Sequence, residues 1–119
     1  MTADATHPIV EGYVAAINAA DADAVVALFA DDAVLVNPLG TFTGSDEITG
    51  FYRDVVVAGQ AVLGVGAVTV DDLAEAATVV RAEVIATSPL DPDGGQLVAD
   101  DVFHLDAAGR IVRLEITYR

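Results

Sequence analysis

The stretch QLVADDVFHLDAAGRIVRLEITY, residues 96–118, decides the fold class of this chain. Apolar and polar residues alternate within 96–105 and within 110–118, and a period of two predicts strands with one buried face. Between these two segments, Asp106-Ala-Ala-Gly109 has the composition of a hairpin turn. The stretch is therefore expected to form two adjacent antiparallel strands.

The same period continues upstream of this hairpin. Strands are predicted near 61–70 and 76–87, and the turn segment Asp91-Pro-Asp-Gly-Gly95 joins the second of them to the hairpin. The half of the chain after Gly59 is therefore expected to be an antiparallel meander.

The half before Gly59 has helical periodicity instead. Apolar residues from Ile9 to Ile17 form one stripe, and Asp21 or Asp23 can cap a second helix whose buried face runs to Phe29. A short strand is predicted at 33–37. A third helix is predicted to begin at Gly44-Ser45-Asp46-Glu47, where acidic residues favour a helix N-terminus.

Helices followed by a meander predict an α+β fold, in which three N-terminal helices pack on one face of a curved, mostly antiparallel sheet. This arrangement is a cone with an apolar interior, where a small apolar ligand can bind. No repeat, linker or low-complexity segment divides residues 1–119, so one domain is expected.

The composition limits the possible functions. The chain has 119 residues and a mass of 12.2 kDa, with 5 basic and 19 acidic residues and a formal net charge of −14. Its hydrophobic fraction of 54% excludes a disordered acidic tail. The shortage of Lys and Arg argues against binding to nucleic acid or to an anionic membrane surface.

Targeting and metal-binding signals are not evident. The N-terminus has no basic region leading into a long apolar run, and no run reaches the roughly 18 apolar residues of a spanning helix, so a cytoplasmic location is expected. The chain has no cysteine, and His7 and His104 are too few for a multi-histidine zinc site. No metal site is expected.

Two polar residues lie where the pattern calls for apolar ones. Asp101 shares a strand face with Leu97, Ala99 and Phe103, and a carboxyl group buried there would remain protonated and donate a hydrogen bond. An edge position open to water would explain Asp101 equally well. Tyr13 lies on the stripe of the first helix, where most tyrosines pack with the hydroxyl group satisfied.

Motifs spread over residues 9–118 resemble bacterial ketosteroid isomerase. They are Val10-Glu-Gly-Tyr13-Val-Ala-Ala-Ile-Asn18, Ala27-Leu-Phe-Ala-Asp-Asp-Ala33, Asn37-Pro-Leu-Gly40, the segment from Gly44 to Phe51-Tyr52-Arg53, Asp101-Val-Phe103 and Gly109-Arg-Ile111. Each motif is weak alone, and their order and spacing make the set specific. The resemblance implies a steroid delta-isomerase, which moves a proton within a 3-ketosteroid through a dienolate and needs no cofactor.

The resemblance also assigns residues. Tyr13 matches the tyrosine of the oxyanion hole, Asp101 matches the protonated aspartic acid beside it, and Tyr52 matches the tyrosine that hydrogen-bonds to the first. A carboxylic acid kept neutral by an apolar site is a known feature of this enzyme. The steroid-binding walls of the family map onto Phe51, Val80, Ala82, Leu97, Ala99, Leu114 and Tyr118.

Asn37 departs from the family. It occupies the position of the aspartate that acts as general base, and an amide cannot accept and return a proton near neutral pH. Strongly reduced isomerase activity is therefore expected. The same residue would serve a non-catalytic binder of steroid-like ligands, and as a residue before proline it would also suit a plain turn.

Other enzymes of this fold remain as alternatives, among them polyketide cyclases, dehydratases and epoxide hydrolases. Dehydratases of this kind usually employ a His-Asp pair, and His104 is predicted on the strand face opposite to Asp101. The family also pairs the outer sheet faces of two subunits. Arg81 and Glu83 are predicted to point outward from an otherwise apolar strand, and a homodimer is expected.

Overall fold

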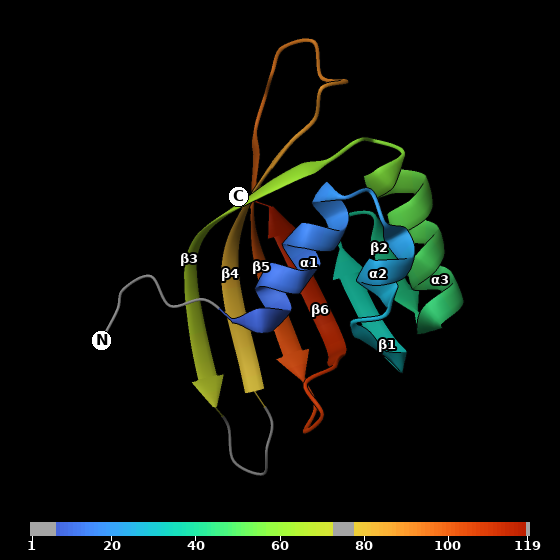
Figure 1. Ribbon diagram of the computed structural model, residues 1–119, viewed down its shortest axis with the longest axis vertical. Helices are drawn as coiled ribbons and strands as arrows, with labels where there is room; N and C mark the ends of the chain where they lie inside the picture. Colours follow the sequence, from blue (N-terminus) through green and yellow to red (C-terminus); the bar gives the residue numbers. More distant parts are fainter. Residues whose placement is uncertain (1–6, 73–77, 119) are drawn as a thin grey trace.

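A computed structural model of the chain describes residues 7–72 and 78–118 (Figure 1). The elements follow one another as α1 (Pro8–Asn18), α2 (Ala22–Val26), β1 (Phe29–Asn37), β2 (Gly40–Thr43), α3 (Gly44–Phe51), a π-helical turn η1 (Tyr52–Val57), β3 (Val62–Asp72), β4 (Thr78–Thr87), β5 (Leu97–Leu105) and β6 (Ile111–Tyr118).

One six-stranded sheet organises the molecule, with the strand order β2-β1-β6-β5-β4-β3. Neighbouring strands are antiparallel except for β1 and β6, which pair in parallel. Figure 1 shows α1 crossing one face of the curved sheet, with α2 and α3 beside β1 and β2. The predicted α+β fold, with three N-terminal helices on a mostly antiparallel sheet, is confirmed.

The first helix forms where its sequence pattern predicts. The backbone amide of Ile9 donates to His7 Nδ1 at the N-cap, and Pro8 occupies the first turn, where its missing N–H is no loss. The stripe of α1 buries Val10, Tyr13 and Ile17 against the sheet. Burial of this stripe, rather than helix propensity, is what stabilises so short a helix.

The second helix is shorter than predicted. Asp21 caps it, with Oδ1 accepting from the amide of Ala24, but α2 ends at Val26. Phe29 is not helical and begins β1, so the strand predicted at 33–37 starts four residues earlier. The short strand β2, Gly40–Thr43, was not predicted; it pairs with the end of β1 through a tight turn.

The meander follows the predicted pattern closely. The four strands lie near their predicted positions, although residues 76 and 77 of the expected second strand lie outside the described residues. Along β5, Ala99, Asp101, Phe103 and Leu105 are buried while the residues between them are less so. The largest fully buried side chains form the core under the helices: Tyr52, Phe103, Leu35, Ile48, Ile111, Leu114, Val10, Val25 and Val80.

No helix among residues 7–72 and 78–118 is long and apolar enough to cross a membrane.

Candidate functional site

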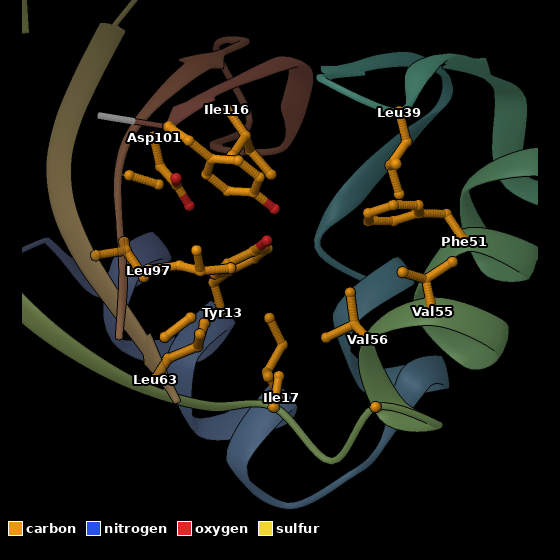
Figure 2. A pocket seen from close by; sticks show the side chains of 16 residues that line it. Tyr13, Ile17, Leu39, Phe51, Val55, Val56, Leu63, Leu97, Asp101 and Ile116 are labelled. Carbon is orange, nitrogen blue, oxygen red and sulfur yellow. The ribbon is translucent and has the colours of Figure 1, made fainter. Parts of the chain in front are cut away.

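The sheet, α1 and the α3–η1 segment surround a cavity of about 230 Å³ (Figure 2). Among its described lining residues, only Tyr13, Asp101 and Tyr118 carry polar side-chain atoms. The remaining lining is apolar and comes from Ile17, Leu39, Phe51, Val55, Val56, Gly59, Ala61, Leu63, Val84, Ala86, Leu97, Ala99 and Ile116. An apolar cavity with few convergent polar groups is the usual form of a small-molecule site.

Tyr13 presents its hydroxyl group to this cavity (Figure 2) and is 3% exposed. Its hydroxyl oxygen lies 2.8 Å from that of Tyr52, and the two rings meet edge to face. Phe103 packs against the Tyr13 ring from the sheet, with ring centroids 5.2 Å apart. Two aromatic neighbours therefore fix the direction of the Tyr13 hydroxyl.

Both tyrosines remain protonated across the ordinary pH range. Burial, with smaller contributions from Tyr52 and Asp101, raises the pKa of Tyr13 well above its usual value of 10. Burial also raises the pKa of Tyr52, although its hydrogen bond with Tyr13 opposes this effect. If Tyr52 donates to Tyr13, the Tyr13 proton is free to reach a ligand in the cavity.

Asp101 lies in β5 between Ala82 of β4 and Ile116 of β6, so it is not at an edge of the sheet. It is 3% exposed, and its carboxyl group points into the cavity (Figure 2). Burial, and secondarily the Asp100 carboxylate, raises the pKa of Asp101 to about 7. Near neutral pH much of this carboxyl group is therefore protonated and can donate a hydrogen bond.

Asn37 lies at the end of β1 and is 8% exposed, but it is not one of the lining residues of the cavity. Its Oδ1 atom accepts a hydrogen bond of 2.8 Å from the backbone amide of Leu39. Its Nδ2 atom is buried and has no hydrogen-bond partner among the described residues. The amide thus holds the β1–β2 turn, and Leu39, not Asn37, contacts the cavity.

The predicted walls of the cavity are only partly its walls in the structure. Phe51, Leu97, Ala99 and Tyr118 line it. Val80, Ala82 and Leu114, also expected there, are buried in the core instead. Val80 and Leu114 flank Phe103 in the sheet, and the Tyr13 ring covers Phe103, which closes this level of the sheet to a ligand.

Several lining residues were not anticipated. Val84 and Ala86 continue the alternate row of β4, so the period of two was a usable signal for them. Val55 and Val56 continue the helical spacing of apolar residues that starts at Ile48, which was a usable signal for this second pair. Leu39 follows a proline in a turn, where no periodicity marks a residue as facing inward.

Other polar groups lie apart from the cavity. His104 is on the opposite face of β5, and its Nε2 atom lies 3.5 Å from Oε1 of Glu115, whose Oε2 accepts from Arg113. Within residues 7–72 and 78–118, no three His, Asp or Glu side chains gather in a way that would hold a metal ion.

Comparisons with known proteins agree with this architecture. The ketosteroid isomerase-like protein from Erwinia carotovora atroseptica is 22% identical, with a TM-score of 0.74, over 92% of this chain and 90% of that one. SalBIII, an epoxide hydrolase/cyclase-like enzyme involved in pyran ring formation in the polyether salinomycin, is 23% identical, with a TM-score of 0.70, over 93% and 88%.

A third similar structure is larger. The orange carotenoid protein of Anabaena (Nostoc), solved with canthaxanthin bound, is 21% identical with a TM-score of 0.86. The match covers 98% of this chain but only 37% of the carotenoid protein. At these identities the likeness concerns the fold alone. The sequence profile of the SnoaL-like domain matches residues 10–114, and the chain therefore belongs to the SnoaL-like domain family.

Proposed function

We propose that the cavity binds a flat, apolar ligand of the 3-ketosteroid or phenolic steroid type, with the ligand oxygen between Tyr13 and Asp101. The observation that carries the proposal is that these two hydrogen-bond donors face one apolar cavity in which neither is exposed to bulk water. The chemistry this arrangement favours is that of a steroid delta-isomerase with low turnover.

Such a site acts by stabilising charge on an oxygen. When a proton leaves the carbon next to a carbonyl group, the oxygen becomes a dienolate anion. Tyr13, oriented by Tyr52, and protonated Asp101 would both donate to that anion. Each preorganised donor in a water-excluding site contributes on the order of 10²–10³ in rate.

The step that this chain lacks is the proton transfer itself. Asn37 stands at the position where the resemblance places the general base, and its side-chain amide cannot accept a proton near neutral pH. Its contact with the Leu39 amide also directs Oδ1 to the backbone. Tight binding of dienolate-like ligands and slow isomerisation are therefore expected together.

A non-catalytic steroid binder is the second candidate, and Asn37 is the observation that favours it, since it leaves both donors in place without a base. A polyketide cyclase or a dehydratase is the third. A dehydratase with a His-Asp pair is disfavoured because His104 and Asp101 lie on opposite faces of β5.

The test is ligand binding by matched variants. Tyr13→Phe and Asp101→Leu should each weaken a phenolic steroid by about 1–3 kcal/mol, the cost of one strong hydrogen bond. Titration calorimetry should show a much smaller loss for the same steroid skeleton without its phenol. Equal losses for both steroids would show that packing was measured, and the proposal would fail.

We also propose that the chain acts as a cytoplasmic homodimer without nucleic-acid or membrane partners. The helices cover one face of the sheet, and the opposite face carries Arg81 and Glu83 between the apolar residues Val79 and Ile85 of β4. A sheet with one uncovered face gains stability by pairing with a second copy.

A further inference from the structure

The mouth of the cavity carries large apolar side chains that remain open to solvent. Leu39, Val55, Leu97 and Tyr118 line the cavity, and each is also among the exposed large hydrophobic residues of the molecule. Leu39 is 67% exposed and Leu97 is 55% exposed. We call these four residues the apolar rim.

The rim is assembled from separate parts of the chain. Leu39 comes from the β1–β2 turn, Val55 from η1, Leu97 from the start of β5 and Tyr118 from the end of β6. Figure 2 shows Leu39 and Val55 on one side of the cavity and Leu97 on the other. Exposed apolar residues that converge on one opening mark a binding surface more often than a scatter of single residues does.

Charge restricts what this surface can bind. None of the described lining residues is a Lys, Arg or His, and the chain has a net charge of −14. An anionic group at the mouth would meet no counter-charge and an unfavourable long-range potential. A neutral hydrocarbon group would instead make favourable apolar contacts with the rim.

We propose that the apolar rim is a distal subsite for the uncharged hydrocarbon tail of a ligand whose oxygen enters first, and that Asn37 positions Leu39 in this subsite. This inference rests on the proposed function for the placement of the oxygen. The tail would extend from the Tyr13–Asp101 end of the cavity to the mouth and cover the rim.

Asn37 acts here through Leu39 and is a positioning residue. Its Oδ1 atom holds the Leu39 amide at 2.8 Å in the short turn that ends at Gly40. With this bond the Leu39 side chain is held over the cavity on the side of Phe51 (Figure 2). Without the acceptor, the turn loses the contact that fixes its shape.

The experiment measures the Kd of phenol, para-propylphenol and para-hexylphenol by titration calorimetry. Each methylene group that reaches the cavity or rim should tighten binding roughly fourfold in the wild-type chain. A carboxylate at the end of the hexyl tail should reverse most of this gain. A wild-type affinity that does not change with tail length would overturn the subsite.

Variants locate the subsite. Leu39→Ser and Leu97→Ser should lower the ratio of hexylphenol to phenol affinity by roughly fivefold to tenfold. Leu90→Ser is the matched control, since Leu90 is 59% exposed but does not line the cavity, and its ratio should equal that of the wild type. The proposal would be overturned if the affinity ratio were similar in all three variants. It would also be overturned if Leu39→Ser and Leu97→Ser changed the sedimentation coefficient but not the affinity ratio.

Asn37 variants test the positioning role. Asn37→Ala removes the acceptor and should lower the affinity ratio as Leu39→Ser does, whereas Asn37→Asp keeps an acceptor oxygen and should retain the ratio. If the two variants had equal affinity ratios, Asn37 would not be the residue that positions Leu39. The ratio of hexylphenol to phenol affinity does not depend on how the phenol group itself binds. If Tyr13→Phe leaves phenol affinity unchanged while hexylphenol still binds more tightly than phenol, the proposed function is refuted and the subsite is retained.

Discussion

Asp101 is the residue whose environment departs furthest from its ordinary one. A carboxyl group in the middle of a sheet, between Ala82 and Ile116 and under the helices, would pay a large desolvation cost if ionised. Its raised pKa is the response to that cost, and it turns an acceptor into a donor at the end of the cavity. The site therefore depends on a residue that costs the folded state stability at high pH.

The first residue-scale prediction follows from this pKa. The folded-state pKa of Asp101, about 7, is above its ordinary value of 3.8, so folding is favoured by protonation of this group. Its contribution is fully present below pH 4 and is lost as the pH rises to about 7. The free energy of unfolding of the wild type, relative to Asp101→Asn, should fall by a few kcal/mol, in order of magnitude, between pH 4 and 7 and then level off. Urea titrations across this range measure it, and a difference independent of pH would contradict the assigned pKa.

The second residue-scale prediction concerns the missing base. Asn37→Asp places a carboxylate where the resemblance puts the proton-transfer group, and a positioned general base contributes about 10²–10⁴ in rate. The kcat for a delta-5-3-ketosteroid should rise by at least this factor, and the pH–rate profile should gain an acidic limb. Asn37→Leu is the control and should remain slow. If Asn37→Asp folds and binds steroid but does not isomerise it, the binder interpretation replaces the isomerase.

At the scale of elements, the π-helical turn shapes the cavity. In η1 the amide of Ala58 bonds to the carbonyl of Arg53 and that of Ala61 to the carbonyl of Val56, both five residues back. The extra residue in each turn widens the helix where Val56 meets the cavity. Gly59 lies just beyond Ala58, the C-cap of this turn, and a Cβ atom there would lie 2.8 Å from the carbonyl oxygen of Val55.

The element-scale prediction uses two glycines of the same segment. Gly59→Ala forces the backbone at Val55 to move and should lower the free energy of unfolding by about 1–3 kcal/mol. Gly50→Ala, in α3, meets nothing within 4 Å and should raise it by about 0.5–1 kcal/mol, because alanine loses less conformational entropy in a helix. Denaturant unfolding curves compare the two variants, and a Gly59→Ala chain as stable as Gly50→Ala would show that the turn adapts without cost.

At the scale of the molecule, the two faces of the sheet differ. One face carries the helices and the cavity, and the other carries Arg81, Glu83 and the His104–Glu115–Arg113 group. The apolar residues Ile85, Val98 and Val102 of this face are half-buried. Subunit contacts combine such apolar residues at the core with charged groups at the rim.

The molecular-scale prediction is a homodimer through this outer face. Sedimentation velocity at micromolar concentration should give one species of about twice the monomer mass. A negative charge introduced in the middle of the face by Val102→Glu should shift the equilibrium toward monomer, whereas Leu90→Ser, in the loop outside the sheet, should not. A wild-type monomer at micromolar concentration would refute the dimer.

The local structure, and the residues that break its pattern, follow from the amino-acid sequence alone. Alternation in 96–118 and the stripe of α1 follow from backbone geometry, which repeats side-chain direction every two residues in a strand and every 3.6 in a helix. Asp101 and Tyr13 stood out for the same reason, and the resemblance to ketosteroid isomerase added the expectations for Tyr52 and Asn37.

How distant parts of the chain meet depends on tertiary packing. The parallel pairing of β1 with β6, the 2.8 Å contact between Tyr13 and Tyr52 and the burial of Asp101 between two strands join residues far apart in the sequence. Such contacts depend on which faces pack together, and no local period encodes that choice. Periodicity also did not predict that Val80, Ala82 and Leu114 lie outside the cavity, because it does not show that the Tyr13 ring covers this part of the sheet. Nor did it predict Leu39 at the mouth of the cavity, because Leu39 is placed there by the β1–β2 turn.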